Sequence, residues 1–222
     1  MSFSPDVRNV MIIGSGLCWT IAYLLIIKRG FQDKTYGMPM FALAANISWE
    51  FIFSAVILTH GMPQHLIDVV LCLFDGVIAY QFLRFGRANF HGTMLERYFW
   101  PTLLVVLVVS FGAVYTMTTG LDAAIVPGTM DGRYAAFAQN LMMSILFVAM
   151  LVNRNNITGQ SVYIALFKLI GTVLPSLLFY PTLPANPFLN FLYVAIFAFD
   201  ALYVGLLIAK CRDLRINPWT RF

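Results

Sequence analysis

The chain is 222 residues long, 60% of its residues are apolar and only 11% are charged, with a formal net charge of +4. Soluble domains are about 45–50% apolar and about 25% charged, and a soluble chain of this size could not hide so much apolar surface. The composition therefore excludes a soluble enzyme, a nucleic-acid-binding protein and a disordered chain, and it indicates a multi-pass membrane protein.

Seven apolar runs follow one another along the chain, each with the length that a helix needs to cross about 30 Å of hydrocarbon. They are Asn9–Ile27, Pro39–Leu58, Leu66–Leu83, Pro101–Thr119, Tyr134–Val152, Ser161–Tyr180 and Phe188–Ala209. Because each run is continuous rather than alternating, the pattern predicts an all-α domain of seven transmembrane helices over residues 1–222. Pro175 lies inside the sixth run and predicts a kink there.

The basic residues are distributed unevenly between the two ends of the expected bundle. The N-terminus and the loops after the second, fourth and sixth runs carry only Arg8 and Arg133. The other loops and the C-terminal tail carry Lys28, Arg29, Lys34, Arg84, Arg87, Arg97, Arg154, Lys210, Arg212, Arg215 and Arg221. Since cytoplasmic loops are enriched in Lys and Arg, we expect the N-terminus outside or in the lumen and the C-terminus in the cytoplasm.

A faint internal similarity relates the first three runs to the last three. Phe74 and Asp75 in the third run align with Phe199 and Asp200 in the seventh. This similarity between the two parts of the chain suggests an arrangement of three helices, a linker helix and three more helices, as in small transporters built from parallel repeats.

Three acidic residues lie near the middle of apolar runs, namely Glu50, Asp75 and Asp200. An ionised carboxylate at that depth costs at least about 2.5–3.5 kcal/mol, so each must face the bundle interior or a cavity. One such residue is readily explained by packing alone, but three at one depth favour a function. A protonated carboxyl group held in a bundle can act as a general acid.

Aromatic and polar residues are expected around these carboxyl groups as substrate-binding residues. In the second run, Asn46, Trp49 and Phe53 share one helical face with Glu50. Lys168 is explained more readily as a counter-ion than as a catalyst. The other candidates lie within further runs: Trp19, Asp75, Tyr115, Asn140, Lys168, Phe197 and Tyr203.

The residue types also limit the chemistry. The sequence has no His, Cys or Glu cluster with metal-ligand spacing, no glycine-rich phosphate loop and no Gly-x-Ser-x-Gly nucleophile motif. We therefore expect acid–base chemistry without a metal or another cofactor. A carboxylic acid among aromatic rings suits a carbocation reaction, because the acid protonates an alkene or epoxide and the ring faces stabilise the cation.

The segment Asn46-Ile-Ser-Trp49-Glu50-Phe, the pair Phe199-Asp200 and the seven runs resemble the membrane-integral terpene cyclases of meroterpenoid and indole-terpenoid biosynthesis. The resemblance implies that Glu50 and Asp200 are the residues needed for protonation. It also implies a metal-independent isomerase or lyase in a bacterial inner membrane or the fungal endoplasmic reticulum. The substrate would be a linear, farnesyl-type prenyl chain on an aromatic, indole or related head group, with a terminal epoxide or alkene.

This hypothesis requires Glu50 and Asp200 to line one dry cavity. The expected partners are a lipophilic prenylated molecule and membrane lipid, with no nucleic acid and no metal. Two alternatives remain at this point. The internal similarity and the mid-span carboxyl groups also fit a small proton-coupled transporter, and a seven-helix receptor or assembly subunit is the third possibility.

Overall fold

The computed structural model describes residues 3–125 and 130–222, which form helices joined by loops. The six longest helices are α1 (Pro5–Gln32), α3 (Gln64–Gln81), α5 (Phe99–Thr116), α7 (Arg133–Arg154), α8 (Val162–Phe179) and α9 (Pro187–Asp213). Three of these helices continue as further turns: α3 into η2 (Phe82–Gly86) and η3 (Arg87–Phe90), α5 into η4 (Met117–Asp122) and α6 (Ala123–Ile125), and α8 into η5 (Tyr180–Thr182). The remaining elements are α2 (Met40–Phe51), the π-helical turn η1 (Ile52–Val56) and α4 (Met94–Arg97).

Local sequence explains where several helices begin. The Ser161 hydroxyl accepts a hydrogen bond of 3.2 Å from the Ile164 amide at the start of α8. The Asn186 side chain accepts one of 3.0 Å from the Leu189 amide at the start of α9, where Pro187 takes the first helical position. Both arrangements satisfy backbone donors that a helix leaves unpaired at its N-terminus, and proline lacks such a donor.

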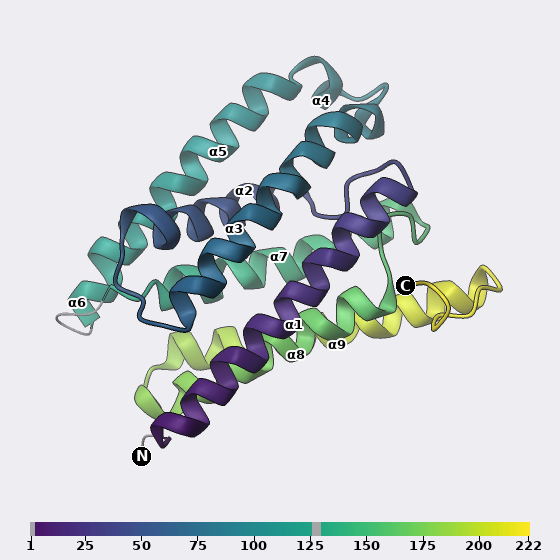
Figure 1. The fold of residues 1–222 in the computed structure, drawn as a ribbon. Coiled ribbons are helices and arrows are strands. Elements are labelled where there is room, and N and C mark those ends of the chain that lie inside the picture. The colour runs from purple at the N-terminus through teal and green to yellow at the C-terminus, as the bar shows by residue number, and fades with distance from the viewer. Residues whose placement is uncertain (1–2, 126–129) are drawn as a thin grey trace.

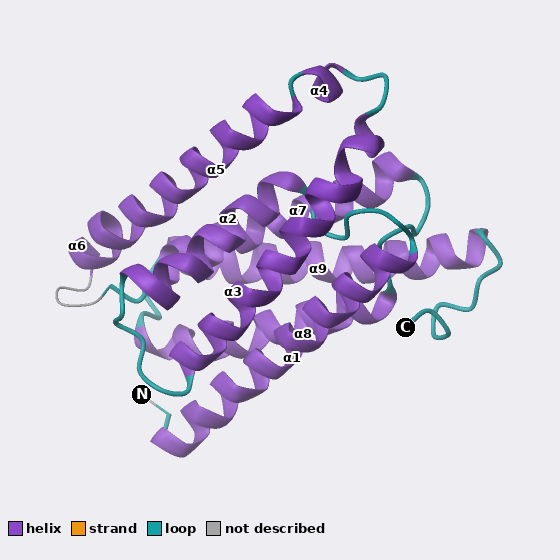
Figure 2. Ribbon diagram, turned by 45° about the horizontal axis from the view of Figure 1, so that its top comes forward, coloured by secondary structure: helices purple, strands orange, loops and turns teal. Residues whose placement is uncertain are grey.

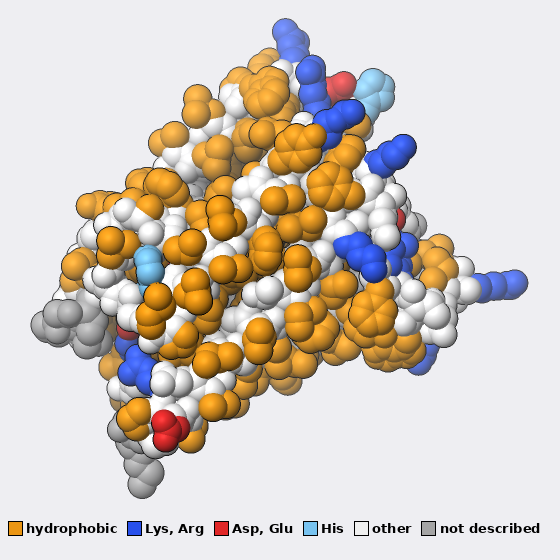
Figure 3. All heavy atoms as spheres, viewed as in Figure 1, with side chains coloured by type: hydrophobic (Ala, Val, Ile, Leu, Met, Phe, Trp, Pro, Cys, Tyr) orange, Lys and Arg blue, Asp and Glu red, His pale blue; other side chains and the backbone are white. Residues whose placement is uncertain are grey.

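Six of the seven predicted runs form helices long and apolar enough to cross a membrane. The second run differs, because its helical part is the shorter stretch Met40–Val56. After Val56 the backbone becomes extended at Ile57, so the helix ends before the predicted boundary at Leu58. Large apolar side chains face outward on α5, including Leu104 and Val108. Figure 3 shows such side chains covering most of the visible face, as a lipid-facing surface requires.

The helices pack in two groups of three, joined by α5. Helix α3 contacts α1 and α2, whereas α9 contacts α7 and α8. The two groups meet where α1 packs on α8 and α2 packs on α7. Helix α5 lies along one edge of the bundle, where it packs mainly on α2 (Figures 1 and 2). The largest apolar cluster includes Met38, Phe82 and Phe147.

Candidate active site

A cavity of about 510 Å³ lies between α1, α2, α3, α7 and α8. Its lining residues on α1 run from Pro5 to Tyr23. The stretch between Arg8 and Tyr23 corresponds to roughly 22 Å at about 1.5 Å per helical residue. The volume is within the range of small-molecule sites, and the length suits an elongated ligand. We call the part beside Arg8 the mouth and the part beside Tyr23 the floor.

Glu50 lines this cavity with a side chain that is only 5% exposed. Its Oε2 atom is buried and has no hydrogen-bond partner among the described residues. Glu50 stands one residue before the end of α2, where the chain continues into the π-helical turn η1. Such turns are frequent at functional sites. A buried carboxyl oxygen without a protein partner is available to a bound substrate.

A hydrogen-bonded group forms the floor beside Glu50. The Asn46 amide nitrogen donates to Asp75 Oδ2 at 2.6 Å and also to the Tyr23 hydroxyl. Asn46 and Tyr23 line the cavity, whereas Asp75 lies behind them and is fully buried. Asp75 therefore holds the Asn46 side chain, which stands one helical turn before Glu50.

Aromatic side chains supply much of the cavity wall. Trp19, Tyr23, Trp49, Phe137 and Phe179 come from four different helices and all line the cavity. Their rings carry negative charge density on their faces and can stabilise a cation that lies over them. The wall is thus suited to hold an apolar chain and to stabilise positive charge on it.

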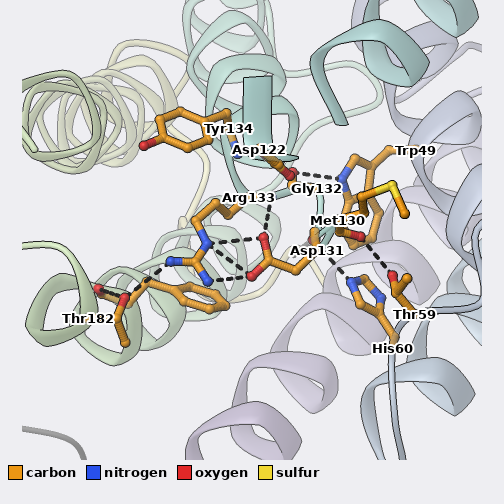
Figure 4. A network of polar contacts seen from close by, with 11 residues as sticks. Trp49, Thr59, His60, Asp122, Met130, Asp131, Gly132, Arg133, Tyr134 and Thr182 are labelled. Atoms are coloured by element: carbon orange, nitrogen blue, oxygen red, sulfur yellow. Dashed lines mark hydrogen bonds and ion pairs between the residues drawn. The ribbon is translucent and has the colours of Figure 1, made fainter. Parts of the chain in front are cut away.

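The mouth is closed on one side by a histidine clamp, formed by His60 with Asp68 and Asp131; Figure 4 shows the contact between His60 and Asp131. His60 Nδ1 lies 2.6 Å from Asp68 Oδ2, and His60 Nε2 lies 3.1 Å from the Asp131 carbonyl oxygen. Burial alone would lower the pKa of His60, but the hydrogen bond and charge of Asp68 and the contact with Asp131 outweigh it, so the pKa is raised. The clamp joins the loop before α3 to the segment before α7.

Arg133 begins α7 beside this clamp. Its Nε atom donates to both carboxylate oxygens of Asp131 at 3.0 Å, and its guanidinium carbon lies 4.9 Å from the centre of the Phe179 ring. Gly132 between them has φ of 67°, and a side chain there would clash with the ring of Phe53. Only glycine fits both the left-handed backbone and the space, so Gly132 sets the direction in which Asp131 and Arg133 leave the turn.

A buried ion pair lies behind the Trp19 side of the cavity. Lys168 Nζ donates to Asp200 Oδ1 at 2.7 Å, to Ser144 Oγ at 2.6 Å and to Asn140 Oδ1 at 3.0 Å. The same Nζ atom is 5.8 Å from the centre of the Trp19 ring. Of these groups, Asn140 and Trp19 line the main cavity. The ion pair therefore reaches the cavity only through those two side chains.

Residues 3–210 match the family described as Pyr4-like transmembrane terpene cyclases. The chain belongs to this family. It is 34% identical over 183 residues to the Pyr4-family terpene cyclase mfmH of Annulohypoxylon moriforme, an alignment that covers 78% of this chain and 70% of that protein. It is 25% identical over 177 residues to the terpene cyclase pyr4 of Aspergillus fumigatus, covering 77% of this chain and 72% of that protein. No solved structure matches the chain.

The family membership confirms the resemblance found from the segment around Glu50, and the terpene cyclases among the relatives give no support to a transporter. The terpene cyclase ascF of Acremonium egyptiacum is 27% identical over 183 residues, which is 78% of this chain and 66% of that protein. The chain is thus a multi-pass membrane protein of a terpene cyclase family.

The structure brings four predicted substrate-binding residues of this family member to the cavity together with Glu50. They are Trp19, Asn46, Trp49 and Asn140. It does not bring Asp200 there. Asp200 instead lines a smaller cavity of about 220 Å³ between α8 and α9, where Lys168 binds its carboxylate. The expectation that Glu50 and Asp200 line one cavity is therefore wrong. The hypothesis fails in the form that places both carboxyl groups at the substrate, and of the two only Glu50 is left as a carboxyl group of the main cavity that could act as the acid.

Other predicted residues also lie outside the main cavity. Tyr115 on α5 and Phe197 on α9 face outward, with 41% and 53% of their surfaces exposed. Tyr203 is buried but donates to the Gln160 side chain at 3.0 Å. Phe53 packs behind the wall, and neither Asp75 nor Lys168 is among the lining residues. The position of a residue within an apolar run sets its depth in the membrane, whereas the rotation of the helix about its axis sets the direction in which its side chain points.

Several lining residues were not expected from the sequence. Tyr23 follows Trp19 by four residues, so helical spacing could have found it. Gln139 lines the cavity, and its Oε1 atom has no hydrogen-bond partner among the described residues. On this helix the sequence had indicated only the neighbouring amide, Asn140, as a substrate-binding residue. His60 comes from a loop, and no local pattern joins it to Asp68.

Proposed function

We propose that this protein cyclises a linear prenyl chain by proton transfer from Glu50. The substrate is a farnesyl-type chain with a terminal epoxide or alkene, attached to an aromatic, indole or related head group. The Glu50 O–H bond breaks as its proton adds either to a terminal alkene carbon or to the epoxide oxygen, whose bond to the more substituted carbon then breaks and leaves a hydroxyl group. The resulting carbocation is attacked by the next double bond, so carbon–carbon bonds form along the chain. The last cation gives up a proton to water, and the Glu50 carboxylate takes a proton back from water, so the acid is restored and the product is an isomer of the substrate.

One observation carries this proposal, namely the unpartnered carboxyl oxygen of Glu50 in the wall of an aromatic-lined cavity. General acid catalysis needs the acid within hydrogen-bond reach of the atom that it protonates. The floor group around Asn46 holds the helical turn before Glu50. The surrounding rings stabilise the cation and limit the access of water, which would otherwise quench it.

Asp200 has a different role in this proposal, because Lys168 separates it from the cavity. An unpaired ammonium group beside Trp19 would repel a carbocation on the cavity side of that ring. Asp200 cancels this charge and holds Lys168 against Asn140. We therefore assign Asp200 as a positioning residue that keeps this wall electrically neutral, and Glu50 as the general acid.

We also infer that the chain crosses the membrane seven times, with the N-terminus outside or in the lumen. The shorter helix Met40–Val56 packs between α3, α5 and α7, which supports its inclusion among the spans. The contacts α1 with α3 and α2 with α3 have counterparts in α7 with α9 and α8 with α9. This correspondence supports a repeat of three helices on each side of the linker α5.

Substitution of Glu50 tests the proposed chemistry. Membranes with the Glu50→Gln variant are supplied with a farnesylated phenol that carries either a terminal epoxide or a terminal alkene, and products of unchanged mass are separated by chromatography. Removal of a general acid lowers turnover by about 100-fold to 10,000-fold, while the unfolding temperature stays close to that of the wild type. Glu96→Gln on α4, at a partly exposed position outside the cavity where the carboxylate contacts His91 and the Gly92 amide, is the matched control. Normal turnover by Glu50→Gln would rule out Glu50 as the acid.

A further inference from the structure

Basic residues at the end of the bundle that holds the N-terminus are scarce. Only Arg8 and Arg133 belong to that side in the charge distribution of the sequence, against eleven Lys and Arg residues on the other side. Both of these arginines line the mouth of the main cavity. The positive-inside rule does not account for arginines on this side of the membrane. The position of both arginines at one opening of the cavity therefore needs a chemical explanation.

Neither acidic residue of the mouth binds Arg8. Asp131 is held by Arg133, and Asp68 is held by His60 and by the Gln64 amide at 2.6 Å. Arg8 forms no ion pair with any described residue. The guanidinium group of Arg8 is exposed and has no carboxylate of the described residues bound to it, so it is free to bind an anion.

The mouth and Glu50 stand at different levels of the cavity. Asn46 on α2 binds Tyr23 on α1, and Glu50 stands one turn from Asn46 just as Trp19 stands one turn from Tyr23, so Trp19 marks the level of Glu50. Arg8 precedes Trp19 by eleven residues on α1, or roughly 16 Å along the helix. Between these levels the wall contains apolar residues such as Ile12, Ile67 and Phe137. A ligand with an anionic head and a long apolar tail would place its head at Arg8 while its tail extends toward Glu50.

We propose that the mouth is a binding site for an acidic head group, a carboxylate or a similarly acidic enol, and that Arg8 is the residue that selects it. Arg133 lies beside this site but is committed to Asp131. The inference rests on the proposed function, since it identifies the substrate class of the same cavity. Guanidinium groups bind carboxylates through paired, charge-assisted hydrogen bonds, which gives Arg8 a geometric as well as an electrostatic preference.

Equilibrium binding of a matched pair of probes tests this site without any catalytic step. The probes are a 4-hydroxybenzoate that carries a fully saturated farnesyl-length chain and the methyl ester of the same compound. Neither saturated chain can be protonated and cyclised, so the result does not depend on the role of Glu50. The wild type, Arg8→Gln, Arg8→Lys and the control Arg97→Gln, an exposed arginine on α4, are compared in nanodiscs of phosphatidylcholine.

We expect the wild type and Arg97→Gln to bind the acid about tenfold more tightly than the ester, as one charge-assisted hydrogen bond allows. Arg8→Gln abolishes this preference and leaves the affinity for the ester unchanged, whereas Arg8→Lys keeps part of it. A wild type that binds neither probe, or that does not prefer the acid, overturns the proposal. So does an acid preference that persists in Arg8→Gln.

A phospholipid phosphate is the other source of an anion at this level. If Arg8 holds a lipid, Arg8→Gln will reduce binding of phosphatidylglycerol and leave the ratio of acid to ester affinity unchanged, which also overturns the proposal. Failure of the Glu50→Gln turnover test with a normal acid preference would instead refute the proposed chemistry and leave the head-group site in place.

Discussion

The Lys168–Asp200 ion pair offers a direct test of how a carboxyl group outside the main cavity supports the reaction. Asp200→Asn keeps the shape of the side chain but leaves the Lys168 ammonium buried without its counter-charge. Removing one partner of a buried ion pair costs about 3–5 kcal/mol. For a chain of this size that loss lowers the unfolding temperature by about 6–20 °C.

Asp200→Asn should also affect the carbocation that forms in the proposed reaction. Lys168 Nζ lies 5.8 Å from the centre of the Trp19 ring. A carbocation on the cavity side of that ring would lie roughly 10 Å from Nζ, where an uncompensated charge costs about 1.7 kcal/mol at an effective dielectric constant near 20. That penalty alone slows the reaction about 15-fold to 20-fold. Lys168→Met in the Asp200→Asn background removes the unpaired charge, so the double variant should recover both stability and turnover.

Thermal unfolding in detergent and turnover in membranes measure the two effects for the wild type, both single variants and the double variant. A positioning role for Asp200 predicts that the double variant is more stable and more active than Asp200→Asn. A double variant that folds stably but is as inactive as Asp200→Asn would refute this reasoning, because Asp200 would then be needed for its own proton or carboxylate.

Three further predictions concern the floor, the mouth and the outer surface. Asn46→Ala leaves buried Asp75 without its amide donor, which should cost about 1–3 kcal/mol and reduce turnover; an unchanged unfolding temperature would contradict the floor network. Because its pKa is raised, His60 stabilises the fold through Asp68 below the ordinary histidine pKa, and this contribution is lost as pH rises through the raised pKa. The difference in unfolding temperature between the wild type and His60→Phe should therefore shrink toward alkaline pH, and a constant difference would disprove the charged clamp. Tyr115→Ala, on the outer surface, should change turnover by less than about twofold, and a large loss would place the substrate elsewhere.

Periodicity along one helix was a sound guide to the face that carries Glu50. Asn46, Trp49 and Glu50 share that face by their spacing, and all three line the cavity. Spacing was less useful where residues from separate helices had to meet. Asp200 stands at the expected depth, but the Lys168 ammonium on the neighbouring helix binds its carboxylate and keeps it out of the main cavity.

The membrane class, the positions of the apolar helices along the chain and the resemblance to terpene cyclases could all be read from the sequence, because composition, run length and a short motif are local properties. Which polar groups share a cavity could not be read from the sequence. That outcome depends on how each helix is rotated about its axis and on which distant side chains meet, as at His60 and Asp131. An apolar run specifies a depth in the bilayer, whereas contacts between helices specify the direction in which each side chain points.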